Sequence, residues 1–189
     1  MSNWYDAWAD RYDERSADVT ADVRFYVGLA READGPLVEL AVGTGRVAIP
    51  VAQATGRRVV GIDSSPAMLA QARERAVEAG VELDLREEDI RELEIDEPAA
   101  LIYCPGRSLL HLPTWADRRR CFERVAASLR PNGRFAWNAL AFDHHIACAI
   151  DDHVEQRRTA AGRYPRRRGS RKRAIKIAHQ THESLGRTE

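Results

Sequence analysis

The chain has 189 residues with 29 basic and 29 acidic side chains, which is long enough for one domain and balanced in net charge. Its three cysteines, Cys104, Cys121 and Cys148, lack paired spacing, which argues against a disulfide framework and a zinc site, and we expect a cytoplasmic protein without bound metal. No apolar run is long enough to span a membrane, and the acidic, aromatic first residues do not predict a signal peptide.

Charge is distributed unevenly along the chain. Residues 1–150 carry 18 basic and 24 acidic side chains, whereas residues 151–189 carry 11 and 5. The sequence therefore predicts a mildly acidic domain over residues 1–156. A basic, mobile tail is expected over residues 157–189, because this stretch has too few apolar residues to build a core.

Apolar periodicity and turn residues predict two N-terminal helices, followed by strands and helices in alternation. The first helix carries an aromatic stripe, and the second ends before Asp34-Gly35-Pro36, which stops a helix. Ser64-Ser65-Pro66 predicts a helix start with proline in the first turn. The predicted helices are 3–15, 17–32, 46–54, 67–79, 114–129 and 143–156, and the predicted strands are 37–42, 57–63, 81–86, 99–104 and 134–140.

This alternation is typical of an α/β fold with a Rossmann-like, doubly wound and mainly parallel sheet that has helices on both faces. Ligands of such sheets bind at the carboxyl ends of the strands. Four features fall at predicted strand ends, namely Gly43 with Gly45, Asp63, Asp89 and the loop Cys104–Ser108. Their coincidence predicts a binding site at this edge of the sheet.

The stretch Pro36–Pro50, PLVELAVGTGRVAIP, contains the most informative of these features. A strand, a glycine turn and a helix start bring several backbone N–H groups together at the positive end of the helix dipole. Glycine also lets a ligand approach the main chain closely. We interpret the stretch as a nucleotide or nucleoside-cofactor site, the alternative being an ordinary strand-to-helix turn that contains glycines.

The segments ELAVGTGR, VVGIDSSPAML, LREEDI, LIYCPGRSLLHL and SLRPNGRFAWNAL follow one another between residues 36 and 140. In order and spacing this series resembles the class I S-adenosylmethionine-dependent methyltransferases. Tyr5-Asp6 and Tyr12-Asp13 resemble the N-terminal helix of small bacterial members of that family. Ala41 departs from the commonest pattern, which has glycine there, and we expect little disturbance from so small a side chain.

The resemblance implies S-adenosylmethionine as the cofactor and assigns residues to its parts. Asp63 would bind the ribose hydroxyls, and Asp89 would accept a hydrogen bond from the adenine amino group. The remaining expected cofactor-binding residues are Glu39, Ala41, Gly43 and Gly45 in the loop along the methionine moiety, Tyr12 at its amino-acid end, Ser64 and Met68 beside the adenosine, Ile90 on the adenine ring, and Cys104 at the end of its strand.

Methyl transfer from a sulfonium depends mainly on aligning the nucleophile, the methyl group and the sulfur. A general base is needed only when the nucleophile carries a proton, and the candidates are His111, His144 and His145. We do not expect His144 and His145 to bind a metal, because adjacent residues on a helix point about 100° apart. The expected substrate is a small molecule, which the sequence does not identify.

Two other functions are compatible with parts of the sequence. Gly43 to Ala48 also fits G-x-G-x-x-A with an acid 18 residues after Gly45, which is typical of an NAD-dependent oxidoreductase. Glu39, Asp89 and the Leu-Arg-Pro-Asn-Gly segment before the fifth strand argue against it. A non-catalytic module whose basic tail binds nucleic acid or another anion is the second alternative, although charged runs are usually solvated.

The resembling family continues past its fifth strand with a helix and an antiparallel hairpin that completes the sheet. The 49 residues after Leu140 are mostly arginine, polar or small, so we expect that hairpin to be incomplete and the C-terminus to be shortened or altered. At most one short strand is predicted, at Ala174–Ala178. An exposed sheet edge would then favour a homodimer.

Overall fold

A computed structural model describes residues 22–139 and the backbone of two strands at 154–159 and 162–167. Its central feature is a five-stranded sheet with the strand order β3-β2-β1-β4-β5, in which every neighbouring pair is parallel. The strands are β1 (Leu37–Leu40), β2 (Val59–Asp63), β3 (Leu83–Glu87), β4 (Ala99–Cys104) and β5 (Leu129–Trp137). The predicted Rossmann-like α/β fold is confirmed.

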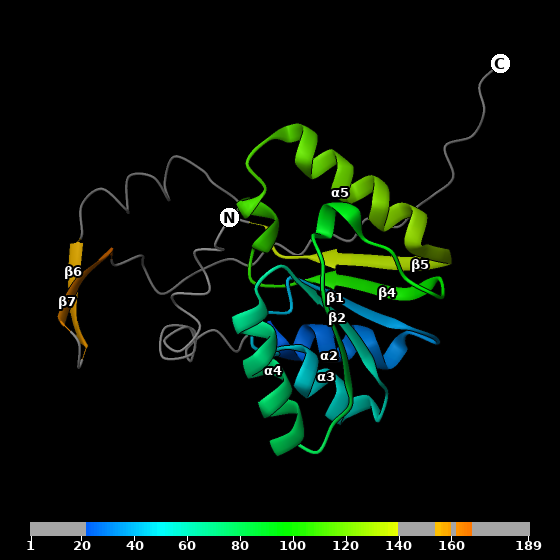
Figure 1. The fold of residues 1–189 in the computed structure, drawn as a ribbon, viewed down its shortest axis with the longest axis horizontal. Helices are drawn as coiled ribbons and strands as arrows, with labels where there is room; N and C mark the ends of the chain where they lie inside the picture. Colours follow the sequence, from blue (N-terminus) through cyan, green and yellow to red (C-terminus); the bar gives the residue numbers. More distant parts are fainter. Residues whose placement is uncertain (1–21, 140–153, 160–161, 168–189) are drawn as a thin grey trace. The chain divides into compact units, whose positions relative to one another are not determined.

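Helices cover both faces of this sheet, with α5 on one side and α2, α3 and α4 on the other (Figure 1). The helices are α2 (Val23–Glu32), α3 (Ala48–Thr55), α4 (Pro66–Glu78) and α5 (Trp115–Ser128), and two short 3-10 helices are η1 (Ile90–Glu92) and η2 (Ser108–His111). The chain runs outward from β1 to β3 and then crosses back to β4. This reversal places the switch point between β1 and β4, where doubly wound sheets bind ligands.

Alternation along the central strands divides the core into two clusters. Leu37 and Tyr103 pack with Tyr26 of α2 on one face, whereas Val38 and Ile102 pack with the α5 side on the other. The rings of Tyr26 and Tyr103 stack with centroids 5.3 Å apart. Because β1 and β4 are buried on both faces, their side chains are almost all apolar, and Glu39 of β1 is the exception that matters for the site.

Short-range signals set most of the helix boundaries. Ser65 is the N-cap of α4 and accepts a hydrogen bond from the Met68 N–H, with Pro66 in the first helical turn. Thr114 and Asp117 form a capping box at the start of α5. Gly56 ends α3 in a left-handed conformation. These boundaries agree with the prediction to within about two residues, the usual uncertainty of helix ends.

Several strand boundaries differ from the prediction. β2 and β3 begin two residues later than predicted, at Val59 and Leu83, and β5 ends at Trp137 and not at Leu140. Two further differences have a clear cause. β1 ends at Leu40 and not at Val42, because Ala41 has φ 53° and leaves the extended conformation. β5 begins at Leu129, five residues before the predicted start, with residues 130–133 bulging out between the pairs Ala99–Leu129 and Leu101–Arg134. The predicted turn therefore lies inside the strand as a bulge.

A separate two-stranded antiparallel sheet is formed by β6 (Val154–Thr159) and β7 (Gly162–Arg167). The expectation of at most one short strand in the tail was therefore wrong, as was the predicted helix over residues 154–156. The prediction considered apolar burial alone, whereas adjacent strands separated by two residues satisfy their backbone groups locally. The predicted helix 3–15 and strand 174–178 lie outside the described residues.

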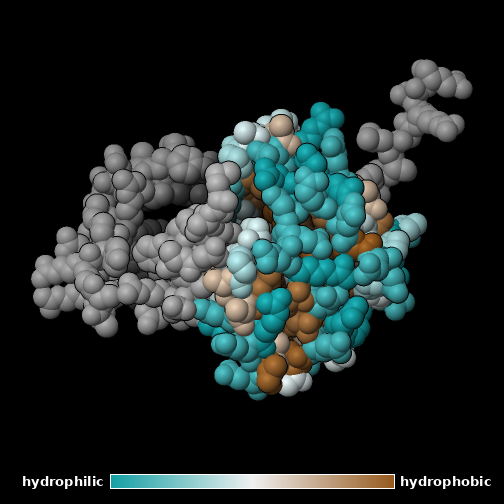
Figure 2. All heavy atoms as spheres, viewed as in Figure 1, coloured by the Kyte–Doolittle hydropathy of each residue, from teal (hydrophilic) through white to brown (hydrophobic). Residues whose placement is uncertain are grey.

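The face seen in Figure 2 is mainly hydrophilic, with apolar side chains visible beside α4 and in smaller patches elsewhere. The large apolar side chains that are exposed in the described part include Val77 of α4, Leu110 of η2 and Trp115 of α5. Of the helices in the described part of the chain, none is both long and apolar enough to cross a membrane.

Candidate functional site

The loop after β1 turns sharply through three residues with positive φ. Ala41, Gly43 and Gly45 have φ values of 53°, 56° and 80°. A Cβ added to Gly45 would lie 2.9 Å from Ile49 Cδ1, and the positive φ of Gly45 would strain any residue with a side chain there. A Cβ added to Gly43 would meet no atom of the described residues within 4 Å. Gly45 therefore closes the loop onto α3, while Gly43 borders open space that a ligand can enter.

Asp63, the last residue of β2, fastens this loop to the neighbouring strand. Its Oδ2 accepts a hydrogen bond from the Gly43 N–H at 2.8 Å, and its Oδ1 accepts one from the Ser65 N–H at 2.9 Å. The backbone N–H of Glu88 donates to the Asp63 carbonyl at 3.1 Å, which links the ends of β2 and β3. The Asp63 carboxylate is thus held at the sheet edge by backbone N–H groups of the loop after β1 and of the turn after β2.

Glu39 belongs to β1, the strand between β2 and β4, and is 1% exposed. Its Oε2 and the Tyr103 hydroxyl are both buried without a hydrogen-bond partner among the described residues. Burial raises the pKa of Glu39 well above its ordinary value. The neighbouring Tyr103 and, to a smaller extent, the positive charge of Arg46 favour the ionised carboxylate and partly offset this rise. A buried carboxyl without a full set of partners costs stability, which favours a functional role for it.

An ion pair that the sequence does not predict joins the glycine loop to the start of α2. Arg46 Nη1 donates to Asp22 Oδ1 at 2.7 Å, and Nη2 donates to Oδ2 at 3.0 Å. The two side chains are 18% and 6% exposed. Arg46 directly follows Gly45 and could have been suspected from that position, whereas nothing in the local pattern marks Asp22 as its partner.

Asp89 lies beyond the end of β3 and is the N-cap of η1. Its Oδ1 accepts from the Arg91 backbone N–H at 2.9 Å, and Arg91 Nη2 donates to its Oδ2 at 2.5 Å. Arg91 Nη1 also donates to Asp117 of α5 at 2.7 Å. The Arg91 side chain beside it is the main reason that the pKa of Asp89 lies below its usual range. Asp89 is therefore an ionised, firmly oriented acceptor.

The other predicted site residues are in different environments. Ser64 is exposed, Met68 is buried in α4, and Ile90 packs partly buried on the α5 side of the sheet. The side chain of Cys104 is fully buried in the same cluster, so only its backbone can face a ligand. Tyr12, His144 and His145 lie outside the described residues.

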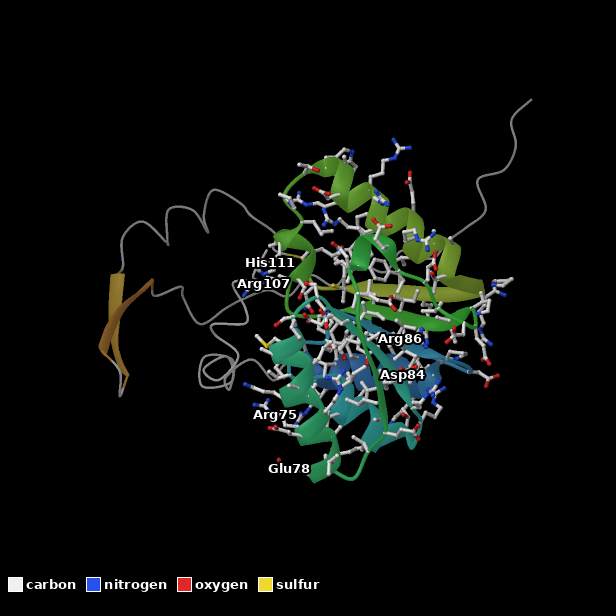
Figure 3. The ribbon with its side chains drawn as sticks, viewed as in Figure 1. Arg75, Glu78, Asp84, Arg86, Arg107 and His111 are labelled. Carbon is white, nitrogen blue, oxygen red and sulfur yellow. The ribbon has the colours of Figure 1, made fainter. Side chains whose placement is uncertain are left out.

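The loop after β4 lies at the same carboxyl edge, on the opposite side of β1 from Asp63. Arg107 has φ 67° and precedes η2, and His111 ends η2 and is exposed. Figure 3 shows both side chains beside η2, in the loop that follows β4. Within the described ranges, no group of three His, Cys, Asp or Glu side chains is placed to hold a metal ion.

A hollow of about 240 Å³ lies elsewhere, where β1 and β2 begin. Arg86, one of its lining residues, makes hydrogen bonds to Asp84 at 2.8 Å and to Asp96 at 2.7 Å. None of the predicted site residues that the structure describes lines this hollow. The carboxyl edge, which brings Glu39, Asp63 and Asp89 to neighbouring strand ends, is therefore the stronger candidate site.

Replacing Ala41 with glycine is expected to stabilise the protein by about 0.5–1 kcal/mol. Left-handed backbone costs a residue with a Cβ about 1–2 kcal/mol, and the extra freedom of glycine in the unfolded chain offsets part of the gain. Thermal unfolding should show a Tm about 1–4 °C higher. Ala70→Gly, at an exposed position of α4, should lower the Tm instead, and a lower Tm for both variants would contradict the prediction.

A family model described as "Methyltransferase domain" matches residues 37–133, just over half of the chain. No match was found among curated proteins. The matched range begins with β1 and ends in the bulge of β5, so it contains every strand end that carries a candidate site residue.

Solved structures with the same fold include the CcbJ methyltransferase from Streptomyces caelestis, with a TM-score of 0.68 and 25% identity over 82% of this chain. The glycopeptide N-methyltransferase MtfA, complexed with S-adenosylhomocysteine, has a TM-score of 0.59 and 26% identity over 87%. The sugar N-methyltransferase KedS8 from Streptoalloteichus has a TM-score of 0.64 and 19% identity over 83%, which shows a shared fold. The present chain covers 62%, 65% and 60% of these three chains.

Proposed function

Since the chain belongs to the family of methyltransferase domains, we propose that it binds S-adenosylmethionine at the carboxyl edge of β1, β2 and β3. There it would transfer the methyl group to a small-molecule acceptor. The observation that carries the proposal is the hydrogen bond from the Gly43 N–H to Asp63, which joins the glycine loop to the acid of the next strand. That acid is in the position that suits the two ribose hydroxyls of a nucleoside.

The residues around this edge suit the separate parts of the cofactor. Glu39 provides a carboxyl group beside the loop that would follow the cationic methionine moiety. Asp89, held by Arg91, would accept from the adenine amino group, and Ile90 would pack on the ring. Open space at Gly43 supports close approach of the ligand to the backbone. Ser64 and Met68 remain predicted contacts, as do Ala41, Gly45 and the backbone of Cys104.

The chemistry requires alignment more than proton transfer. S-adenosylmethionine supplies an activated methyl group on a sulfonium. The protein residues bind and orient the two substrates and exclude water, and such positioning can lower a barrier by up to about 7–11 kcal/mol. His111, exposed at the end of η2, is the candidate base in the described part of the chain for an acceptor that must lose a proton.

For the acceptor we propose an amine of a small molecule. The support is the likeness to MtfA, a glycopeptide N-methyltransferase with 26% sequence identity over 87% of this chain. We also propose a cytoplasmic setting, which the free thiols of Cys104 and Cys121 support. A homodimer through the outer edge of β5 remains a prediction. A domain boundary near residue 156 also remains a prediction, and β6 includes residues on both sides of it.

Isothermal titration of the full chain with S-adenosylhomocysteine and with NAD tests the cofactor. We expect saturable heat at one site for S-adenosylhomocysteine and none for NAD. Saturable heat with NAD alone would overturn the proposal in favour of the oxidoreductase alternative. Incubation with a panel of amines and S-adenosylmethionine, followed by mass spectrometry for a gain of one methyl group, then tests the acceptor class.

A further inference from the structure

The Asp22–Arg46 ion pair has a geometry that a surface pair lacks. Both guanidinium Nη atoms donate to the two carboxylate oxygens, at 2.7 and 3.0 Å, and Asp22 is only 6% exposed. Bidentate pairs of this kind fix the relative orientation of the two groups. The pair spans 24 residues of sequence, so it fixes the start of α2 against the glycine loop.

The position of Asp22 shows that its carboxylate is committed to this pair. Asp22 is the N-cap of α2, where an aspartate side chain usually accepts a hydrogen bond from the first helical turn. Here its side chain makes no such capping bond, and only its backbone carbonyl accepts, from the N–H groups of Phe25 and Tyr26. Removing the charge from Asp22 would therefore leave the helix cap unchanged.

Arg46 is equally well placed to influence the loop. It directly follows Gly45, and a Cβ built on Gly106, in the loop after β4, would lie 3.9 Å from its Nη2. Its charge also acts on the buried carboxyl of Glu39. One guanidinium thus lies where α2, the glycine loop and the loop after β4 meet.

We propose that the Asp22–Arg46 pair is a positioning element that holds the glycine loop in the conformation that binds the amino-acid end of the cofactor. The inference rests on the proposed function and goes beyond it, because neither residue was expected to act at the site. Breaking the pair should weaken ligands that contact the loop through an amino-acid moiety. Ligands that contact only the ribose and adenine side, at Asp63 and Asp89, should be affected little.

Asp22→Asn tests this with two ligands, S-adenosylhomocysteine and 5′-methylthioadenosine, which lacks the amino-acid moiety. We expect the Kd of S-adenosylhomocysteine to rise at least about tenfold and that of methylthioadenosine to stay within about twofold. A loss shared equally by both ligands would indicate general destabilisation and overturn the proposal. An unchanged Kd for S-adenosylhomocysteine in the folded variant would also overturn it.

Two further variants keep the experiment decisive. Glu32→Gln breaks another ion pair of α2, in which Arg134 Nη1 lies 2.8 Å from Glu32, and should change neither Kd. Asp22→Asn combined with Arg46→Gln removes both charges and leaves neither partner as an unpaired buried charge, so this double variant replaces the single variant if that one does not fold. The double variant should also bind S-adenosylhomocysteine more weakly and methylthioadenosine about as tightly as the unaltered chain. If the unaltered chain binds no S-adenosylhomocysteine, the proposed function itself fails.

Discussion

Replacing Asp63 with alanine is expected to weaken binding of S-adenosylhomocysteine about 10- to 150-fold, which corresponds to about 1.5–3 kcal/mol for hydrogen bonds to a charged group. The carboxylate accepts from the N–H groups of Gly43 and Ser65, at 2.8 and 2.9 Å. The substitution therefore removes both the proposed ribose acceptor and the link that holds the glycine loop to β2. Isothermal titration at one pH and ionic strength measures the change.

Glu87 offers a matched control for this variant. It ends β3, pairs in register with Asp63 and is exposed, so Glu87→Ala removes a carboxylate at the same edge without touching the loop. Its Kd should stay within about twofold of that of the unaltered chain. If Asp63→Ala folds normally and binds as tightly as Glu87→Ala, the ribose site lies elsewhere.

Glu39→Gln is expected to stabilise the protein increasingly as the pH rises above about 4.5. Glu39 is 1% exposed, and its Oε2 has no hydrogen-bond partner within the described part of the structure. Burial is the main cause that raises its pKa well above the ordinary value of 4.5, and the charges of Asp22 and Asp63 act in the same direction. Tyr103 and Arg46 oppose the shift.

The direction follows from the protons bound in each state. Between the unfolded pKa near 4.5 and the raised folded pKa, folded Glu39 holds a proton that the unfolded chain has released. The free energy of unfolding therefore falls as the pH rises through this window, by at most about 1.4 kcal/mol per pH unit for one proton. Glutamine does not titrate, so the difference between variant and unaltered chain should grow with pH. Chemical unfolding between pH 5 and pH 9 measures it.

Asp84 provides the control of opposite sign. The hydrogen bond from Arg86 is the main reason that its pKa lies below 3.8, so its stabilising contribution is present at neutral pH and is lost as the pH falls. Asp84→Asn should therefore be destabilising at pH 7 and approach the unaltered chain in acid. A pH-independent difference for Glu39→Gln would mean that Glu39 is ionised in the folded protein.

Much of the local structure could be predicted because its causes lie within a few residues. Ser65 and Pro66 start α4, and Gly56 ends α3, through contacts within one helical turn. The apolar run 99–104 was predicted with both ends correct, since a strand buried on both faces needs apolar side chains throughout. The strand ends that carry Gly43, Asp63 and Asp89 followed from the same patterns.

Features that depend on backbone conformation were missed. Ala41 leaves the extended conformation early, because the turn after β1 needs a positive φ at this position, which an alanine in the sequence does not predict. Residues 130–133 looked like a free turn, but a Cβ on Gly133 would lie 2.8 Å from the Ala99 carbonyl, so this segment packs against β4 as a bulge. The hairpin of β6 and β7 was missed because strand pairing does not require an apolar core.

The sequence by itself determined the alternation of strands and helices, the glycine turn and the acids that end β2 and follow β3, because periodicity and turn chemistry are local properties. Only the tertiary structure decided that Asp22 meets Arg46 and that Glu39 is buried beside Tyr103 without a full set of hydrogen bonds. Those contacts join residues 24 and 64 positions apart. They arise from the strand order, which brings β1 between β2 and β4, and from the packing of α2 on that part of the sheet.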